Sequence, residues 1–233
     1  MPRKPRIYAP GITSHIVQRG NNRSACFFSE DDFKIYINAL GDALSLYNVK
    51  LHAFVLMTNH VHLLMTPATT EGISCVMQSV GRTYVSTINR LYHRTGTLWE
   101  GRHKACLIDS ESYFLACQRY IELNPVRANM VKHPSEYTWS SYQFHGVGRK
   151  ITCLTPHTIY QALGLTPEIR QRRYRELFNT ALPPEQIHTI RNCLNQLSLQ
   201  SSPLGNDKFR AEIEAHLNVR FGHLAPGHPV KSE

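Results

Sequence analysis

The pattern of apolar and polar positions in the first 125 residues predicts a mixed series of strands and helices. Short apolar or alternating runs indicate strands, and apolar residues that recur every three or four positions indicate helices. The turn dipeptide Thr58-Asn59 separates two apolar runs and predicts an antiparallel hairpin. The predicted strands are 14–19, 49–57, 61–65 and 104–108, and the predicted helices are about 30–47, 73–93 and 110–124.

This order matches a ferredoxin-like split unit with one added helix. RNA-recognition modules share much of it, but they carry exposed aromatic residues on the central strands where this chain has two histidines. From about residue 155 onward the pattern is helical throughout, and the end of the chain is expected to be flexible. We therefore predict an α+β fold, in which an antiparallel sheet has helices on one face and is followed by an all-helical C-terminal extension. The predicted domains are 1–148 and 149–233.

The net charge of the chain indicates a polyanionic binding partner. The net charge is +9, and residues 1–150 carry +7 of it. Such an excess favours nucleic acid over an anionic membrane. No segment reaches the ~18 apolar residues of a spanning helix, so we expect no membrane association and a cytoplasmic, nucleoid-associated protein. The six scattered cysteines argue against a zinc ribbon or a disulfide framework and are expected to be buried and reduced.

The candidate chemistry lies on the third strand and the third helix. Residues two apart in a strand point to the same face, so His60 and His62 can bind one divalent ion together. Tyr120 and Asn124 share a helical face, where the Asn124 amide oxygen can complete the ligands and Tyr120 can attack a bound phosphate. Taken singly, a His-x-His pair or a helical tyrosine is more often part of the packing. Glu122, on another face of the helix, is expected at the surface.

Several stretches in register resemble the REP-associated tyrosine transposases, relatives of the single-tyrosine HUH insertion-sequence transposases. The resemblance covers roughly residues 10–145, and every presumed catalytic position matches. The stretches are Ile-Val-Gln-Arg-Gly-Asn at 16–21, Asn-His-Val-His-Leu-Leu at 59–64, Leu-Trp-Glu-Gly-Arg at 98–102, Arg-Tyr-Ile-Glu-Leu-Asn-Pro-Val at 119–126 and Trp-Ser-Ser-Tyr at 139–142.

The resemblance implies an HUH nuclease that cleaves and rejoins single-stranded DNA at REP-like hairpins. In such an enzyme His60 and His62 bind the metal, with Asn124 as third ligand, and Tyr120 forms a 5′-phosphotyrosine. Nitrogen and oxygen ligands suit Mg²⁺ or Mn²⁺ and do not exclude Zn²⁺. A covalent phosphotyrosine conserves the bond energy, so the same site can rejoin strands.

DNA contacts are expected from a basic N-terminal arm and from cations near the site. Trp99 either stacks on a base or closes the core, and the core is favoured. The alternative function is a catalytically silent regulator that binds hairpin DNA on the same fold. A ribonuclease toxin is disfavoured, because the His60/His62 and Tyr120/Asn124 pairs would then be accidental. Monomer and homodimer both remain open. The predicted DNA-binding residues are Arg3, Lys4, Arg6, Arg19, Arg82, Arg90, Arg102 and Lys104.

Overall fold

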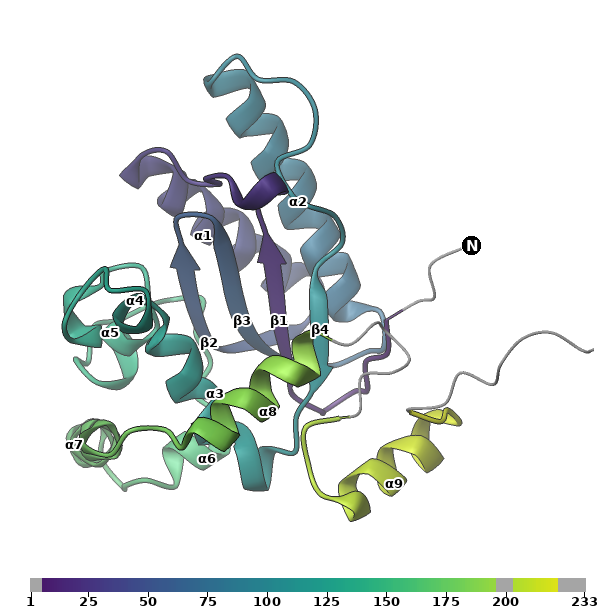
Figure 1. Ribbon diagram of the computed structural model, residues 1–233, viewed down its shortest axis with the longest axis vertical. Helices are drawn as coiled ribbons and strands as arrows, with labels where there is room; N and C mark the ends of the chain where they lie inside the picture. Colours follow the sequence, from purple (N-terminus) through teal and green to yellow (C-terminus); the bar gives the residue numbers. More distant parts are fainter. Residues whose placement is uncertain (1–5, 196–202, 222–233) are drawn as a thin grey trace, which may run out of the picture.

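The computed structural model describes residues 6–195 and 203–221. Its centre is a four-stranded antiparallel sheet in the order β2-β3-β1-β4, which is the order of a ferredoxin-like unit (Figure 1). The predicted fold class and order of elements are therefore confirmed. The strands are β1 (Ser14–Arg19), β2 (Val49–Met57), β3 (His60–Pro67) and β4 (Lys104–Leu107).

Local signals explain most of these elements. The β2–β3 hairpin turns at Thr58-Asn59, as predicted, and pairs Met57 with His60. Helix α1 (Glu30–Leu46) starts with a capping box, in which Asp32 accepts hydrogen bonds from the backbone N–H groups of Phe28 and Ser29. Helix α2 spans Gly72–Leu91, close to its predicted range.

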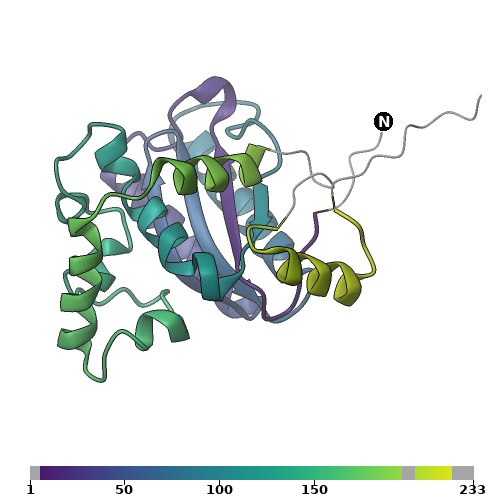
Figure 2. The same ribbon diagram turned by 60° about the horizontal axis from the view of Figure 1, so that its bottom comes forward.

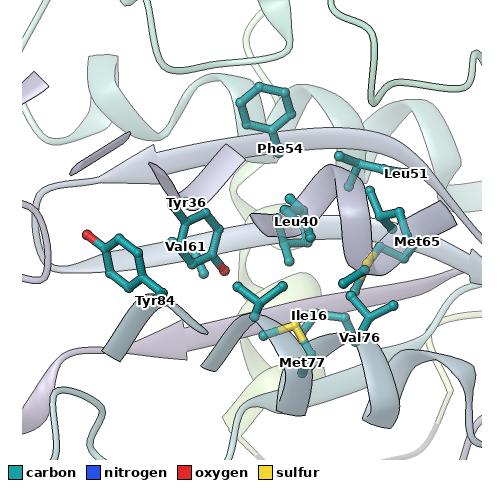
Figure 3. Close-up of a cluster of buried hydrophobic side chains, with 14 of the residues drawn as sticks. Ile16, Tyr36, Leu40, Leu51, Phe54, Val61, Met65, Val76, Met77 and Tyr84 are labelled. Carbon is teal, nitrogen blue, oxygen red and sulfur yellow. The ribbon is translucent and has the colours of Figure 1, made fainter. Parts of the chain in front are cut away.

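Helices α1 and α2 cover one face of the sheet. Ile16, Val61 and Met65 from the strands pack there against Leu40 of α1 and Val76 of α2 (Figure 3). Trp99 is 5% exposed in the same cluster, which confirms the prediction that it closes the core. The larger hydrophobic core lies between this face and the two helices, and burial of its apolar side chains supplies much of the driving force for folding.

The opposite face is also covered, which corrects the expectation that helices lie on one face only. Helix α3 (Ser110–Glu122) contacts β2 and β3, while α8 (Pro184–Asn195) contacts β1 and β4 (Figure 1). The physical reason is that the second face also carries apolar residues such as Val55 and Leu64, which must be buried. Ile190 and Leu194 of α8 help to bury them.

Helix α3 begins and ends slightly differently from the prediction. Asp109, not Ser110, caps it, and its carboxylate accepts from the Glu111 N–H. The helix ends at Glu122, and Pro125 lies in the first turn of the short helix α4 (Asn124–Arg127). A proline is tolerated there because the first N–H groups of a helix have no intrahelical partner.

The C-terminal part is helical, as predicted. Figures 1 and 2 both place α7 and α9 at opposite ends of this part of the molecule. The domain boundary at residue 148 stays a prediction. Helix α8, which lies beyond it, packs in the second core together with the sheet. The stretch predicted to be flexible, residues 222–229, lies outside the described residues. The remaining elements are η1 (Asn21–Arg23), η2 (Pro134–Glu136), α5 (Tyr142–His145), α6 (Thr158–Gln161), α7 (Pro167–Glu176), η3 (Leu177–Asn179) and α9 (Asp207–Leu217).

Two of the cysteines depart from the expectation that all six are reduced. Cys106 of β4 and Cys193 of α8 form a disulfide, with their Cα atoms 5.8 Å apart. They are 87 positions apart in the chain, so no spacing pattern could reveal the pair. Among the described residues, no helix is both long and apolar enough to cross a membrane.

Candidate active site

The predicted histidine pair lies on the face of the sheet that α3 covers. Because cross-strand partners share a face, the register of β1, β3 and β4 places the side chains of Val17, His62 and Lys104 together, and those of Arg19 and His60 beside them. The ring centroids of His60 and His62 are 5.0 Å apart. The alternation of a strand therefore brings the two imidazoles together as the sequence predicts.

Tyr120 lies on α3 directly above these rings. Its ring centroid is 6.0 Å from that of His62, and its side chain is 5% exposed. The spacing of Tyr120 along α3 carries it onto the buried side of the helix, in the same cluster as Val55 and Met57 of β2. The structure thus brings together the predicted nucleophile and the two predicted metal-binding histidines.

A third histidine, which the sequence did not single out, completes the group. His15 of β1 forms a hydrogen bond between its Nε2 and Nδ1 of His62, at 2.8 Å. Its ring centroid lies 5.9 Å from that of Tyr120. The only sequence signal for His15 is its place two residues before Val17 on an alternating strand, which puts the two side chains on one face. No local signal shows that this strand lies next to β3, so its contact with His62 could not be predicted.

Burial keeps all three imidazoles neutral. Loss of solvation lowers the pKa of His15 to about 3, with a smaller effect from the nearby Arg127. Burial also lowers the pKa of His60 to about 4, helped by the charge of Arg19. The pKa of His62 is pushed well below its usual value by burial first and by its histidine neighbours second. Near pH 7 each ring therefore keeps a nitrogen lone pair.

Asn124 is placed differently from its predicted partners. Its amide Nδ2 donates to the carbonyl oxygens of Tyr120 and Ile121, both at 3.1 Å, and so satisfies the last turn of α3. Within residues 6–195 and 203–221, no three His, Cys, Asp or Glu side chains form a group that could hold a metal ion. The two histidines fit a divalent ion as neutral nitrogen donors, provided that oxygen ligands come from elsewhere. The ligand role of Asn124 stays a prediction.

Arg127 is a second residue that sequence reasoning missed. Its guanidinium carbon lies 4.1 Å from the centroid of the Tyr120 ring, a cation–π arrangement. Its Nη2 donates to the Tyr120 carbonyl oxygen at 2.6 Å. The short helix α4 (Asn124–Arg127) places the Arg127 side chain against the Tyr120 ring.

Glu122 is not at the surface, contrary to the expectation. Its side chain is fully buried and accepts hydrogen bonds from Ser141 Oγ at 2.6 Å, His145 Nδ1 at 2.8 Å and Tyr174 Oη at 2.7 Å. The face of α3 that carries Glu122 is covered by α5 and α7, which no pattern within α3 reveals. The network fixes the end of the helix that carries Tyr120.

The predicted DNA-binding residues are spread over the molecule. Arg19, Arg102 and Lys104 are exposed near the ends of β1 and β4. Arg82 and Arg90 are exposed on α2, which covers the face opposite Tyr120. Arg6 Nε donates to the His103 carbonyl oxygen at 2.6 Å, whereas Arg3 and Lys4 lie outside the described residues. Their DNA contacts stay predictions.

A solved structure with a similar fold supports this architecture. The chain matches a REP-associated tyrosine transposase bound to a REP hairpin with a TM-score of 0.55 and 16% identity, over 67% of this chain and 99% of that one. It also matches a protein from Deinococcus radiodurans R1 assigned as a transposase, with 24% identity over 52% and 96% of the two chains. The TM-score of that second match is 0.36.

The fold is that of the matched transposase structure, and the sequence places the chain in a class of DNA transposases. The family model described as "Transposase IS200 like" matches residues 9–124, about half of the chain, and includes His60, His62 and Tyr120. This chain belongs to the IS200-like transposase family, whose members carry out DNA transposition and are usually metal-dependent. No curated relative matches the sequence.

Proposed function

We propose that this protein cleaves and rejoins single-stranded DNA at REP-like hairpins, as a metal-dependent REP-associated tyrosine transposase. The observation that carries the proposal is the placement of Tyr120 over His62 on one face of the sheet, with ring centroids 6.0 Å apart. The neighbour that shares the fold is a transposase bound to a REP hairpin. Such an enzyme acts on chromosomal DNA, which places it in the cytoplasm with the nucleoid.

The proposed metal ligands are the Nε2 atoms of His60 and His62. The Nδ1 atom of His60 is hydrogen-bonded to Asn59 Oδ1 at 2.6 Å, and that of His62 to His15, so Nε2 is the remaining nitrogen of each ring. For His62 to bind through Nε2, its Nδ1 carries the proton and donates to His15 Nε2. A bound Mg²⁺ or Mn²⁺ supplies Lewis-acid polarisation of the phosphate.

Tyr120 is the proposed nucleophile. Its phenol loses a proton to water, its oxygen forms a bond to phosphorus, and the bond from phosphorus to the 3′ oxygen breaks. The departing 3′ oxygen takes up a proton, which leaves a 5′-phosphotyrosine and a free 3′-hydroxyl. The reverse sequence rejoins a strand without an outside energy source, because the phosphotyrosine bond is retained.

A covalent-adduct assay tests this function directly. The protein is incubated with Mg²⁺ or Mn²⁺ and a labelled single-stranded oligonucleotide that contains a REP hairpin with its flanks, and adducts are separated on a denaturing gel. We expect an adduct with wild type and with Tyr113→Phe, a matched control on the same helix, and none with Tyr120→Phe or His62→Ala. An equal adduct from Tyr120→Phe would falsify the proposal.

One observation favours the alternative, a catalytically silent regulator that binds hairpin DNA. The amide of Asn124 is engaged with the carbonyls of its own helix, which leaves the protein with two of the three predicted metal ligands in place. If wild type binds the hairpin tightly but forms no adduct with either metal, the regulator is the better description.

A further inference from the structure

Arg127 presents an unsatisfied donor inside the proposed active site. Its Nη1 atom is shielded from solvent and has no hydrogen-bond partner in residues 6–195 and 203–221. The rest of the guanidinium is held in place, since it stacks on the Tyr120 ring at 4.1 Å and Nη2 donates to the Tyr120 carbonyl. A buried donor without a partner costs roughly 1–3 kcal/mol, and more when it is charged, so its occurrence calls for a ligand.

The charges around Arg127 specify the kind of ligand. In the part of the chain that the structure describes, Arg127 forms no ion pair with a carboxylate. Burial lowers the pKa of Arg127 to about 10; the neighbouring Tyr120 side chain acts in the opposite direction, and the charge of Arg191 on α8 adds to the lowering. The group therefore remains cationic at neutral pH. Arg19, near His60 and His62, adds a further positive charge. A largely buried cation with other cations in its vicinity is stabilised by a bound anion.

We propose that Arg127 binds the phosphate that Tyr120 attacks. This inference rests on the proposed function and adds a catalytic residue to it. Nη1 donates to a non-bridging oxygen of the phosphate, while the stacked remainder of the guanidinium holds the Tyr120 ring beside it. A guanidinium suits both tasks because its donors form a rigid, planar fork. Negative charge on the phosphoryl oxygens in the transition state is stabilised by such a fixed donor.

The first test measures binding without chemistry. In a Tyr120→Phe background, the affinity for a REP-hairpin oligonucleotide with single-stranded flanks is measured by fluorescence anisotropy across a range of salt concentrations. Loss of one phosphate contact reduces the slope of log K against log salt by about 0.7–0.9. We expect this reduction with Arg127→Gln. The matched control is Arg119→Gln, because Arg119 donates to the Thr180 carbonyl and stacks over Phe178 instead.

The second test separates charge from geometry. Arg127→Lys keeps a cation but not the planar fork, so we expect its salt slope to equal that of the parent protein. In the protein that retains Tyr120, we expect this substitution to lower the rate of adduct formation about 10²-fold, which is the size of loss seen for one transition-state donor. This variant also keeps the proposal testable if Arg127→Gln fails to fold, which circular dichroism would reveal.

The outcomes distinguish this inference from the proposed function. If the Tyr120→Phe protein does not bind the hairpin at all, both are overturned. If it binds and the salt slope is the same in Arg127→Gln, Arg119→Gln and the parent, only the role of Arg127 is overturned. The same holds if Arg127→Lys forms adduct at the wild-type rate, because a positioned fork is then not required.

Discussion

Replacing Glu122 with alanine is the sharpest test of how the helix that carries Tyr120 is held. The carboxylate is fully buried and accepts hydrogen bonds from Ser141 and His145, at the two ends of α5, and from Tyr174 of α7. Truncation removes the acceptor from the buried donors of His145 and Tyr174, whereas Ser141 Oγ can still donate to the Phe54 carbonyl oxygen at 3.2 Å. Breaking a buried pair of this kind costs about 3–5 kcal/mol, and a hydrogen bond to a charged group contributes about 1.5–3 kcal/mol. We therefore expect a loss of about 3–5 kcal/mol in the free energy of unfolding.

Urea unfolding, followed by tryptophan fluorescence and by circular dichroism, measures this loss. Glu111→Ala is the matched control, since Glu111 is exposed in the first turn of the same helix and its removal should cost only about 0.5 kcal/mol. Tyr174→Phe removes one of the three bonds and should cost about 1–2 kcal/mol. The reasoning is refuted if Glu122→Ala destabilises the protein no more than Glu111→Ala does.

Three further predictions concern pH, redox state and metal binding. Burial lowers the pKa of His103 to about 3 and that of His52 to about 4. Below about pH 6.5 the unfolded chain binds more protons than the folded one, so the free energy of unfolding should be full above that pH and fall toward pH 4. The fall should reach up to ~1.4 kcal/mol per pH unit for each histidine. In His103→Gln, the midpoint of urea unfolding should therefore change less with pH than in wild type. Thiol titration of the denatured, non-reduced chain should find four of the six cysteines free, and reduction should cost about 2–4 kcal/mol of stability; six free thiols would exclude the disulfide. His15→Ala should weaken Mn²⁺ binding roughly 10–100-fold by calorimetry, and an unchanged affinity would show that His62 does not need this neighbour.

The strands and helices between residues 14 and 122 are predictable because their signals are local. Apolar spacing, the Thr58-Asn59 turn and the capping residues act within a few positions, so the predicted ranges of β1 and β2 agree with the structure. The same holds for His60 and His62, whose common face follows from the alternation of one strand. The position of Tyr120 over them was expected from the resemblance, and the packing of α3 on the sheet is what brings it about.

Contacts between distant segments could not be predicted in this way. The hydrophobic pattern of α3 marks the side that packs on the sheet, but it does not show that α5 and α7 bury Glu122 on another side. Nor does it show that α4 turns Arg127 back onto the Tyr120 ring. The pairing of Cys106 with Cys193 likewise depends on α8 crossing β4, and helices on the second face follow from the same packing.

The sequence by itself determined the order of strands and helices, the shared face of His60 and His62, and the basic character that suits DNA. These properties depend on neighbours along the chain, where periodicity and charge are already visible. Only the tertiary structure decided that His15 contacts His62, that Glu122 is buried, and that the Arg127 guanidinium stacks on the Tyr120 ring. Each of these depends on which surface a distant segment covers, and that is set by the packing of the whole chain.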